Sequence, residues 1–354
     1  MSADQVIRWG ILGAGRIAHR FAASLRSEPQ AKLVAISCRS AAKAAAFAEK
    51  FNVATADALS DEALGGEAGA AHETLLTRPD IDAIYLALPH GLHRVWAIRA
   101  LRAGKAVLCE KPAALSADEM REVAAVARET GTLFMEAMKT RFTPCYARVR
   151  ELVAAGAIGR ITRVETALEN DMGERLSSRT DYMSDPKQGG VLLDTGIYCA
   201  CWLEDYLAGQ FEVTRSRARF DTDVDSFVDA ELSFAGQGDT DSHVTRAAAP
   251  NEQATARLIT ACDSDELPRQ ARLIATKGTI IVDDLHRPVH AEVRIEDEDP
   301  YTIDLPYEVD DFYGQIHHFC ELMRTGAPES PVMPLAASIR CAEMLDAIRA
   351  SLIS

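Results

Sequence analysis

The sequence lacks long apolar runs, a basic amino-terminal flank and any excess of positive charge. No stretch approaches the ~18 consecutive apolar residues of a membrane-spanning helix, and the start, MSADQVIRWGILGAG, does not have the form of a signal peptide. Asp and Glu (53) outnumber Lys and Arg (38), giving a formal net charge of −15, which disfavours binding to nucleic acid or anionic lipid. We therefore expect a cytoplasmic protein with no nucleic-acid or membrane partner.

Paired cysteine and histidine ligands are also missing. The eight cysteines contain no CxxC pair, so the sequence predicts neither a disulfide framework nor a zinc site, and we interpret them as buried thiols. His286 and His290 lie four residues apart, and His317 and His318 are adjacent, but no carboxylate spacing completes a ligand set. We expect no metal site.

What is present is an ordinary globular composition in a chain of two-domain length. Hydrophobic residues make up 47% and charged residues 26% of the 354 residues, so a sizeable core can form. At roughly 100–200 residues per domain, the length predicts two domains. We find no internal repeat that would suggest a solenoid.

Residues 1–138 alternate between short apolar runs and Ala-rich helical stretches. This alternation is typical of βαβ units, and it predicts an α/β domain with a parallel sheet covered on both faces. The predicted strands are Ile7–Leu12, Lys32–Ser37, Ala83–Leu88, Ala106–Cys109 and Leu133–Met135. The predicted helices are Ile17–Arg26, Ala41–Phe51, His93–Ala103 and Ala117–Glu129.

Residues 139–354 have a different pattern and form the predicted second domain. A helix over Pro144–Ala155 is followed by alternating stretches with few helices between them, which favours an α/β domain with a large, open, mostly antiparallel sheet. Two helices are predicted at the end, over Asp311–Arg324 and Leu335–Leu352. The polar stretch 236–253 is predicted to be a loop. The predicted strands are Ile161–Leu168, Glu212–Phe220, Phe227–Phe234, Ala256–Ala261, Ala271–Ala275, Thr279–Asp283 and Ala291–Ile295.

A GxGxxA turn follows the first predicted strand and opens the first predicted helix. The first glycine permits a tight turn, the second lets the backbone approach a diphosphate, and the alanine lets helix and strand pack closely. A glycine-rich turn can also serve packing alone, but strand, turn and helix together favour dinucleotide binding. The candidate turn is Gly13, Ala14, Gly15, Arg16, Ile17 and Ala18.

The end of the second strand lacks the acidic residue that NAD-preferring sites place roughly 20 residues after the loop. The sequence there reads ISCRS, and Arg39, Ser40 and Lys43 are positioned to donate hydrogen bonds to a 2′-phosphate. An ordinary surface arginine is the alternative. We expect NADP, with NAD less favoured.

Three further motifs carry a family resemblance: LPHGLH at 88–93, EKP at 110–112 and GGVLLDTGIY at 189–198. With GILGAGRIA they resemble the Gfo/Idh/MocA oxidoreductase family over essentially the whole chain. MEAMKTRFTP at 135–144 is similar to dimeric trans-dihydrodiol dehydrogenases and NADP-dependent D-xylose 1-dehydrogenases. The resemblance implies a Rossmann domain, a second domain on a large open sheet, and a homodimer or higher homo-oligomer, many relatives pairing through that sheet.

The resemblance also implies a set of functional residues. The lysine of the EKP motif corresponds to Lys111, and the acid pair of the family corresponds to Asp194 and Tyr198. The family's Pro-Asn-x-x-His turn has His90 in place of its Asn, and residues 54–69 are longer than the usual link, which we interpret as a surface excursion. The further candidate cofactor contacts are Leu88, Pro89, His90, His93, Glu110, Lys111 and Arg141.

Hydride transfer at a carbon bearing oxygen leaves one proton to be handled. Tyr198 can act as the acid or base if an ammonium such as Lys111 lowers the pKa of its phenol from ~10. Asp194 would share a helix face with Tyr198 if this segment is helical, and would orient the substrate hydroxyl or stabilise the lysine. Taken singly, the three also have ordinary explanations: a solvated charge, a helix cap and a core aromatic.

For two other candidate site residues, a functional and a structural role are equally possible. His93 contacts the nicotinamide side of the pocket or caps a helix, and Arg141 binds cofactor or substrate or forms a structural salt bridge. The resulting hypothesis is an NADP-dependent oxidoreductase acting on a sugar, polyol or vicinal diol. The alternatives are a redox-inactive NAD(P)-binding sensor on the same scaffold and, less favoured, a retaining glycosidase that keeps its NAD bound.

Overall fold

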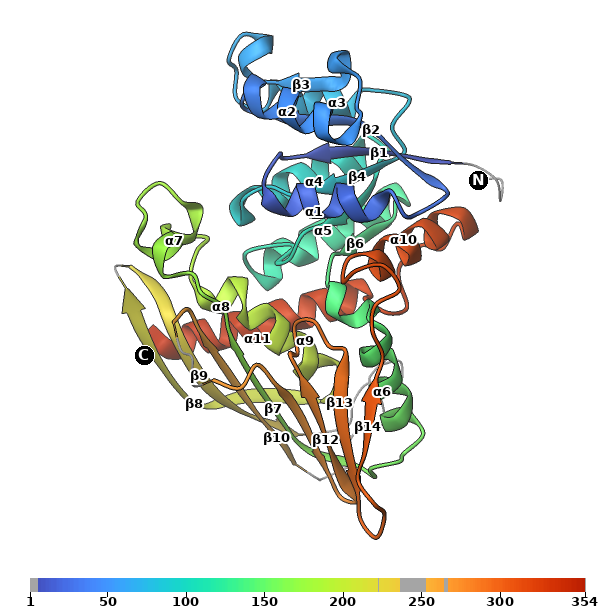
Figure 1. Ribbon diagram of the computed structural model, residues 1–354. Helices are drawn as coiled ribbons and strands as arrows, with labels where there is room; N and C mark the ends of the chain where they lie inside the picture. The colour runs from blue at the N-terminus through green and yellow to red at the C-terminus, as the bar shows by residue number, and fades with distance from the viewer. Residues whose placement is uncertain (1–5, 222, 236–252, 264–266, 354) are drawn as a thin grey trace. The chain divides into compact units, whose positions relative to one another are not determined.

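The computed structural model describes residues 6–221, 223–235, 253–263 and 267–353 (Figure 1). These residues form two compact units. The Rossmann unit comprises residues 1–114, 118–139 and 308–335, and the sheet-B unit comprises residues 115–117, 140–307 and 336–354. The chain passes between the units at 139/140, next to the predicted boundary, but residues 308–335 return to the Rossmann unit.

The Rossmann unit is built on a six-stranded sheet of order β3-β2-β1-β4-β5-β6, in which every pairing is parallel. The strands β4 and β5 are buried along their whole length, as expected when helices cover both faces. The order reverses between β1 and β4, the place where open α/β sheets bind ligands. The strands are β1 (Ile7–Leu12), β2 (Ala31–Cys38), β3 (Ala58–Ser60), β4 (Ala83–Leu86), β5 (Ala106–Cys109) and β6 (Phe134–Glu136).

Six α-helices and several 3-10 turns accompany this sheet. The helices are α1 (Arg16–Leu25), α2 (Ala41–Phe51), α3 (Ala70–Leu76), α4 (His93–Arg102), α5 (Ala117–Thr130) and α10 (Tyr313–Thr325). The 3-10 turns are η1 (Thr55–Asp57), η2 (Glu62–Leu64) and η3 (His90–Leu92), and η4 (Lys139–Phe142) begins at the last residue of the segment 118–139 and continues into the sheet-B unit. In chain order the four helices predicted within residues 1–138 correspond to α1, α2, α4 and α5.

The segment 54–69 is more than the surface excursion that we predicted. It contains β3, an edge strand whose Ala58 lies opposite Ile36 of β2, between η1 and η2. A strand of only three residues carries no alternation that a sequence pattern can reveal. The helix α3 that follows was also not predicted.

The sheet-B unit contains an eight-stranded sheet of order β14-β13-β12-β11-β7-β10-β9-β8. All pairings are antiparallel except that of β7 with β10. The strands are β7 (Ile161–Glu169), β8 (Gln210–Asp221), β9 (Val224–Ala235), β10 (Ala254–Ala261), β11 (Ala271–Ala275), β12 (Gly278–Asp283), β13 (His290–Ile295) and β14 (Tyr301–Asp304).

Helices cover one face of this sheet. The helix α9 (Gly196–Tyr206) is buried at every position and packs on β7 and β10, while α8 (Val191–Asp194) packs on β9 and β10. On β10, Thr260 faces these helices and contacts Thr195, whereas Arg257 and Ile259 lie on the opposite, half-exposed outer face. The remaining elements are α6 (Pro144–Ala154), α7 (Gly173–Ser177), η5 (Tyr182–Ser184) and α11 (Leu335–Ile353).

The predicted fold class is therefore confirmed: a Rossmann α/β domain and an α/β domain with a large, mostly antiparallel sheet. The last strand, β14, and the short helices α7 and α8 were not predicted. The predicted loop 236–253 lies, except for Gln253, outside the described residues. Among the helices that the structure describes, none has both the length and the apolar run needed to span a bilayer.

Candidate active site

The turn between β1 and α1 has the geometry that a diphosphate requires. Gly13 has a φ of +104°, and a Cβ atom there would lie 2.3 Å from the carbonyl oxygen of Ala87, so only glycine fits. Gly15 is the N-cap of α1; no side chain caps it, and a Cβ atom there would meet nothing within 4 Å. The first turn of α1 holds no acidic residue, so the positive end of the helix dipole is open to an anion. The turn fits a dinucleotide.

The end of β2 brings together the residues predicted to select NADP. Arg39 and Lys43 are exposed, and Ser40 is the N-cap of α2, without a capping bond from its side chain. The structure adds a residue that sequence reasoning missed: the backbone N–H of Ala41 donates to Oε2 of Glu62 at 2.8 Å. Glu62 comes from η2, 21 positions further along the chain.

The carboxyl end of β5 presents Lys111 above a buried polar cluster. Glu110 is buried and accepts a hydrogen bond from the hydroxyl of Tyr85, and its backbone N–H donates to the carbonyl of Leu86 at 2.9 Å. Burial raises the pKa of Glu110, although Tyr85 and the nearby ammonium groups of Lys111 and Lys139 act in the opposite direction. Lys111 itself is half-buried, and its ammonium is close enough to Glu110 to act on the pKa of that carboxyl.

His93 links two of the predicted cofactor turns. Its side chain is fully buried, with Nδ1 2.7 Å from the carbonyl oxygen of Pro112 and Nε2 2.8 Å from that of Leu88. Burial lowers the pKa of His93, since it outweighs the two carbonyls that favour the charged form. His93 therefore joins the 88–89 turn to the turn after Lys111, a role that neither of our two alternatives had foreseen. His90 is also buried, in η3.

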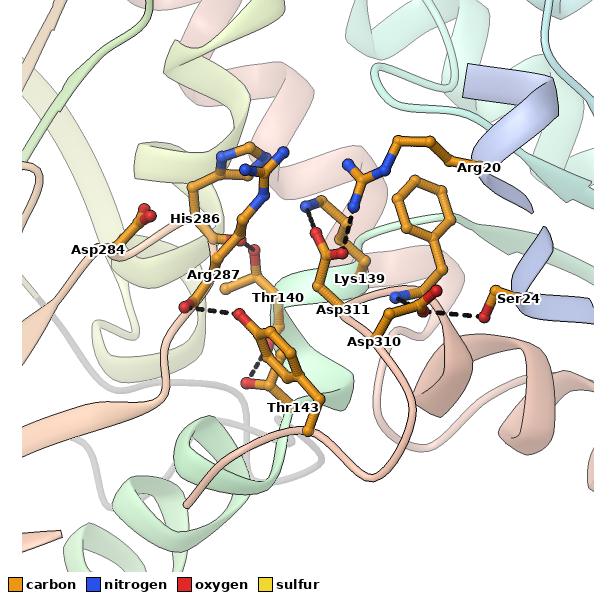
Figure 2. A network of polar contacts seen from close by, with 12 residues as sticks. Arg20, Ser24, Lys139, Thr140, Thr143, Asp284, His286, Arg287, Asp310 and Asp311 are labelled. Atoms are coloured by element: carbon orange, nitrogen blue, oxygen red, sulfur yellow. Dashed lines mark hydrogen bonds and ion pairs between the residues drawn. The ribbon is translucent and has the colours of Figure 1, made fainter. Parts of the chain in front are cut away.

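The segment before α10 ties α1 to the end of β6 within the Rossmann unit (Figure 2). The carboxylate of Asp311 pairs with the ammonium of Lys139 and with the guanidinium of Arg20 on α1. The neighbouring Asp310 accepts a hydrogen bond from the Ser24 hydroxyl at 2.9 Å. These partners are about 170–290 residues apart in sequence, so no local signal could have revealed them.

In the sheet-B unit, Asp194 and Tyr198 are both buried but do not belong to one continuous helix. α8 ends at Asp194 and α9 begins at Gly196, while Thr195 between them keeps right-handed helical backbone angles (φ −107°, ψ −34°) and donates its N–H to the carbonyl of Val191 at 2.9 Å. The start of α8 is fixed by Asp225, which accepts the N–H of Leu192 at 2.6 Å. Asp194 and Tyr198 therefore lie four positions apart across the junction of two short helices, and the helix face that we expect them to share stays a prediction.

Tyr198 contacts a residue that our prediction assigned no function. The imidazole of His286 lies against the phenol ring, with centroids 4.3 Å apart and planes tilted by 54°. His286 lies between β12 and β13 and is half-buried. We had considered it only as a metal ligand.

The backbone around His286 is anchored at three consecutive carbonyl groups, residues 285–287. They accept hydrogen bonds from Trp202 Nε1 at 2.9 Å, from Thr140 Oγ1 at 3.0 Å and from the hydroxyl of Tyr307 at 2.7 Å, respectively. Figure 2 shows the contacts of Thr140 and of the Arg287 carbonyl. The donors come from three different segments, so the imidazole is held in a defined position beside the phenol.

Arg141 lies in the sheet-B unit, with its guanidinium fully buried. It pairs with the carboxylate of Glu204, and one of its nitrogens donates to the carbonyl of Cys201 at 3.1 Å. Burial would lower the pKa of Arg141, but Cys201 and Glu204 hold it well above its ordinary value. This geometry matches the structural salt bridge of our two alternatives, and we leave Arg141 out of the proposed cofactor site.

The remaining candidates are divided between the two units. The Rossmann unit holds every other cofactor candidate and Lys111, while the sheet-B unit holds Asp194 and Tyr198. That the lysine and the phenol meet at one substrate stays a prediction. Within the described residues, no group of three His, Cys, Asp or Glu side chains is arranged to hold a metal ion.

A Rossmann unit with an open glycine turn, combined with a second unit on a large open sheet, defines a two-domain dinucleotide-dependent oxidoreductase. Comparison with known families agrees: residues 7–138 match "Oxidoreductase family, NAD-binding Rossmann fold" and residues 146–281 match "GFO/IDH/MocA C-terminal domain". The chain belongs to the Gfo/Idh/MocA family of oxidoreductases. The resemblance that we drew from its motifs is confirmed, as is the prediction of an enzyme.

Individual relatives cover nearly the whole chain. The trans-1,2-dihydrobenzene-1,2-diol dehydrogenase of Mus musculus is 31% identical over 97% of this chain and 96% of its own length, and that of Homo sapiens is 28% identical over the same shares. Among solved structures, KijD10, a 3-ketoreductase from Actinomadura kijaniata in complex with NADP and TDP-benzene, has a TM-score of 0.77 at 25% identity over 98% of both chains. A levoglucosan dehydrogenase with NADH and levoglucosan shares the fold, with a TM-score of 0.80 at 19% identity over 99% of this chain and 98% of its own.

Proposed function

We propose that the protein is an NADP-dependent dehydrogenase or reductase that transfers a hydride between nicotinamide and the carbon of a C–O group in a sugar, polyol or vicinal diol. The observation that carries this proposal is the β1–α1 turn, where Gly13 admits no side chain and Gly15 opens onto free space at an uncapped helix start. A turn built for packing alone would have no need of that opening.

The choice of NADP rests on the adenosine end of the predicted site. Arg39, Ser40 and Lys43 supply donors and positive charge where NAD-preferring relatives of this fold carry an acid at the strand end. The 25%-identical KijD10 was solved with NADP bound, which supports the same choice. The substrate class is supported by the names of the relatives, a dihydrodiol dehydrogenase and a ketoreductase, and by the levoglucosan dehydrogenase.

When bound, the nicotinamide supplies or accepts the hydride. In the proposed mechanism, Tyr198 gives the accompanying proton to the substrate oxygen or takes it away, and the ammonium of Lys111 holds that oxygen in place. Lys111 also makes the charged phenol less costly, because a cation near a phenol lowers its pKa. Asp194 orients the substrate hydroxyl. Glu110 and His93 keep the Lys111 turn fixed through the buried contacts described above.

The experiment that tests this function is a turnover assay with a panel of substrates. Purified protein is mixed with NADP or NADPH and with aldoses, polyols, vicinal diols and the matching carbonyl compounds, and absorbance of the reduced nicotinamide is followed. We expect turnover with at least one member of the panel. Binding of NADPH without turnover of any of them would instead support the redox-inactive sensor.

The expected homo-oligomer is part of the same proposal. The outer face of sheet B carries ion pairs between strands, including Arg257 to Asp229 at 2.9 Å and Arg217 to Asp229 at 2.8 Å, around the half-exposed Ile259. A sheet face with both charges and apolar side chains suits pairing with a second copy of itself about a two-fold axis. The cytoplasmic location stays a prediction.

A further inference from the structure

Glu62 brings a carboxylate to the end of β2, where the strand itself has no acidic residue. Its carboxylate accepts the N–H of Ala41, the first residue of α2, at 2.8 Å. Its own N–H donates to the carbonyl of Arg39 at 3.2 Å, and the N–H of Asp61 donates to the carbonyl of Cys38 at 3.1 Å. The turn that carries Glu62 is therefore fastened to the end of β2, where the adenosine ribose is expected.

The turn is held from its other side as well. The buried carboxylate of Asp61 accepts the N–H groups of Gly69 at 3.0 Å and Ala71 at 2.9 Å, which closes the loop between η2 and α3. Because hydrogen bonds hold both the backbone and the carboxylate of Asp61, the neighbouring Glu62 has a defined position. It lies in the segment 54–69, which is longer here than in the usual family link.

Positive charge lies beside this carboxylate. Arg39 and Lys43 are exposed, and within the described part of the chain neither forms an ion pair. Charges of both signs act on the Cys38 thiol. Burial raises the pKa of this thiol, Lys43 lowers it, and Asp61 and Glu62 raise it further. Lys43, Asp61 and Glu62 therefore lie near the same strand end, and Arg39 is the first residue after it.

These charges act differently on the two nicotinamide cofactors. NADPH brings a 2′-phosphate, which carries about −1.5 to −2 charges near neutral pH, as phosphate monoesters do. That group is attracted by Arg39 and Lys43, but Glu62 repels it and already accepts the N–H of Ala41, a donor at the start of α2. NADH has a 2′-hydroxyl at the same place, and a carboxylate there is favourable or neutral.

We propose that Glu62 is a specificity-determining residue that limits the preference of this protein for NADPH over NADH. The proposal rests on the dinucleotide site of the proposed function and concerns only its adenosine end. Arg39 and Lys43 favour the 2′-phosphate, and Glu62 opposes it by charge and by occupying a donor. Removing the charge of Glu62 raises the affinity for NADPH and leaves that for NADH almost unchanged.

The test is a set of equilibrium dissociation constants for NADPH and NADH, measured by titration calorimetry on the full chain. Glu62→Gln keeps an oxygen that can accept the Ala41 N–H but loses the charge. Glu67→Gln changes an exposed glutamate of the same loop whose side chain makes no polar contact with β2 among the residues that the structure describes. We expect Glu62→Gln to lower the Kd for NADPH by about fivefold, the size of one charge–charge interaction at contact distance in water. The Kd of Glu62→Gln for NADH should stay within about twofold of that of the unaltered protein, because NADH has no 2′-phosphate. The two Kd values of Glu67→Gln should also stay within about twofold, because Glu67 does not lie beside the 2′-phosphate.

A second pair of probes localises the effect. Adenosine 2′,5′-bisphosphate and adenosine 5′-monophosphate differ only in the 2′-phosphate, so Glu62→Gln should tighten the first and not the second, and the gain should shrink at high salt. An unchanged NADPH-to-NADH ratio in Glu62→Gln, or an equal change in Glu67→Gln, overturns the inference while the oxidoreductase proposal stands. Failure of the unaltered protein to bind either cofactor overturns both.

Discussion

The imidazole of His286 packs against the phenol of Tyr198, with ring centroids 4.3 Å apart. This contact joins the residue proposed to move the substrate proton to a loop whose backbone is fixed by three side chains from other segments. A phenol that transfers a proton must reach the substrate oxygen in one orientation, and an adjacent ring restricts the rotation of its side chain. His286 therefore belongs to the environment that positions Tyr198.

This contact predicts the outcome of two substitutions at His286. His286→Ala removes the ring, and we expect kcat to fall about tenfold with KM changed much less, because a misplaced phenol slows the chemical step more than binding. His286→Phe keeps a ring of similar size and should recover most of the loss. Steady-state kinetics with the best substrate of the panel measure both values. Equal kcat in His286→Ala and the unaltered protein would contradict the role.

Lys111→Met should abolish turnover and leave cofactor binding largely intact. The change removes the ammonium that the proposal places at the substrate oxygen but keeps an unbranched side chain of similar length, and Gly13, Gly15 and Arg39 are untouched. Turnover assays and NADPH titrations measure the two effects separately. A variant that keeps most of its kcat would remove Lys111 from the mechanism.

His72 predicts an acid-sensitive stability of the Rossmann unit. Burial lowers its pKa to about 4, with Asp61 opposing, and Nδ1 lies 2.7 Å from the hydroxyl of Ser37. The unfolded chain binds a proton at His72 below about pH 6.5 and the folded chain only near pH 4, so stability falls as pH drops through this window. The free energy of unfolding should lose about 2 kcal/mol from this group between pH 7.5 and 5.

Urea unfolding at the two pH values, followed by circular dichroism, measures this effect. His72→Gln keeps a hydrogen-bonding side chain without a titrating group near neutral pH, so its stability should depend less on pH than that of the unaltered protein. The same pH dependence in both proteins would show that His72 does not carry the effect.

Asp311→Asn should strongly destabilise the Rossmann unit. The carboxylate is buried and pairs with both Lys139 and Arg20, so its neutralisation removes one charge partner of the buried ammonium, at a cost of about 3 kcal/mol. Glu122→Gln, at the exposed pair with Arg94, should cost less than about 1 kcal/mol. Urea unfolding at pH 7.5 compares the two variants, and equal small losses would show that the buried network adds little.

Ile259→Asp should prevent oligomer formation without unfolding the chain. Ile259 is a half-exposed residue on the outer face of sheet B, and a carboxylate there would have to lose its hydration in a symmetric contact through this face. Val309→Asp alters an exposed apolar residue of the Rossmann unit and serves as the control. Light scattering after size exclusion gives the mass of each. An oligomer that persists in Ile259→Asp would place the contact elsewhere.

The sequence by itself determined the features that local pattern encodes. The order of strands and helices in residues 1–138, the GxGxxA turn and the alternation of the second domain follow from periodicity and backbone geometry, which act within a few residues. The motifs for Lys111, Asp194 and Tyr198 were likewise visible as short runs.

Only the tertiary structure decided which distant groups meet. It bonded the Glu62 carboxylate to the N–H of Ala41 at the start of α2, returned residues 308–335 to the Rossmann unit so that Asp311 reaches Lys139, and set His286 against Tyr198. Such contacts form because packing brings together surfaces separated by tens to hundreds of residues. Local propensity, which sets each element, contains no information about those neighbours.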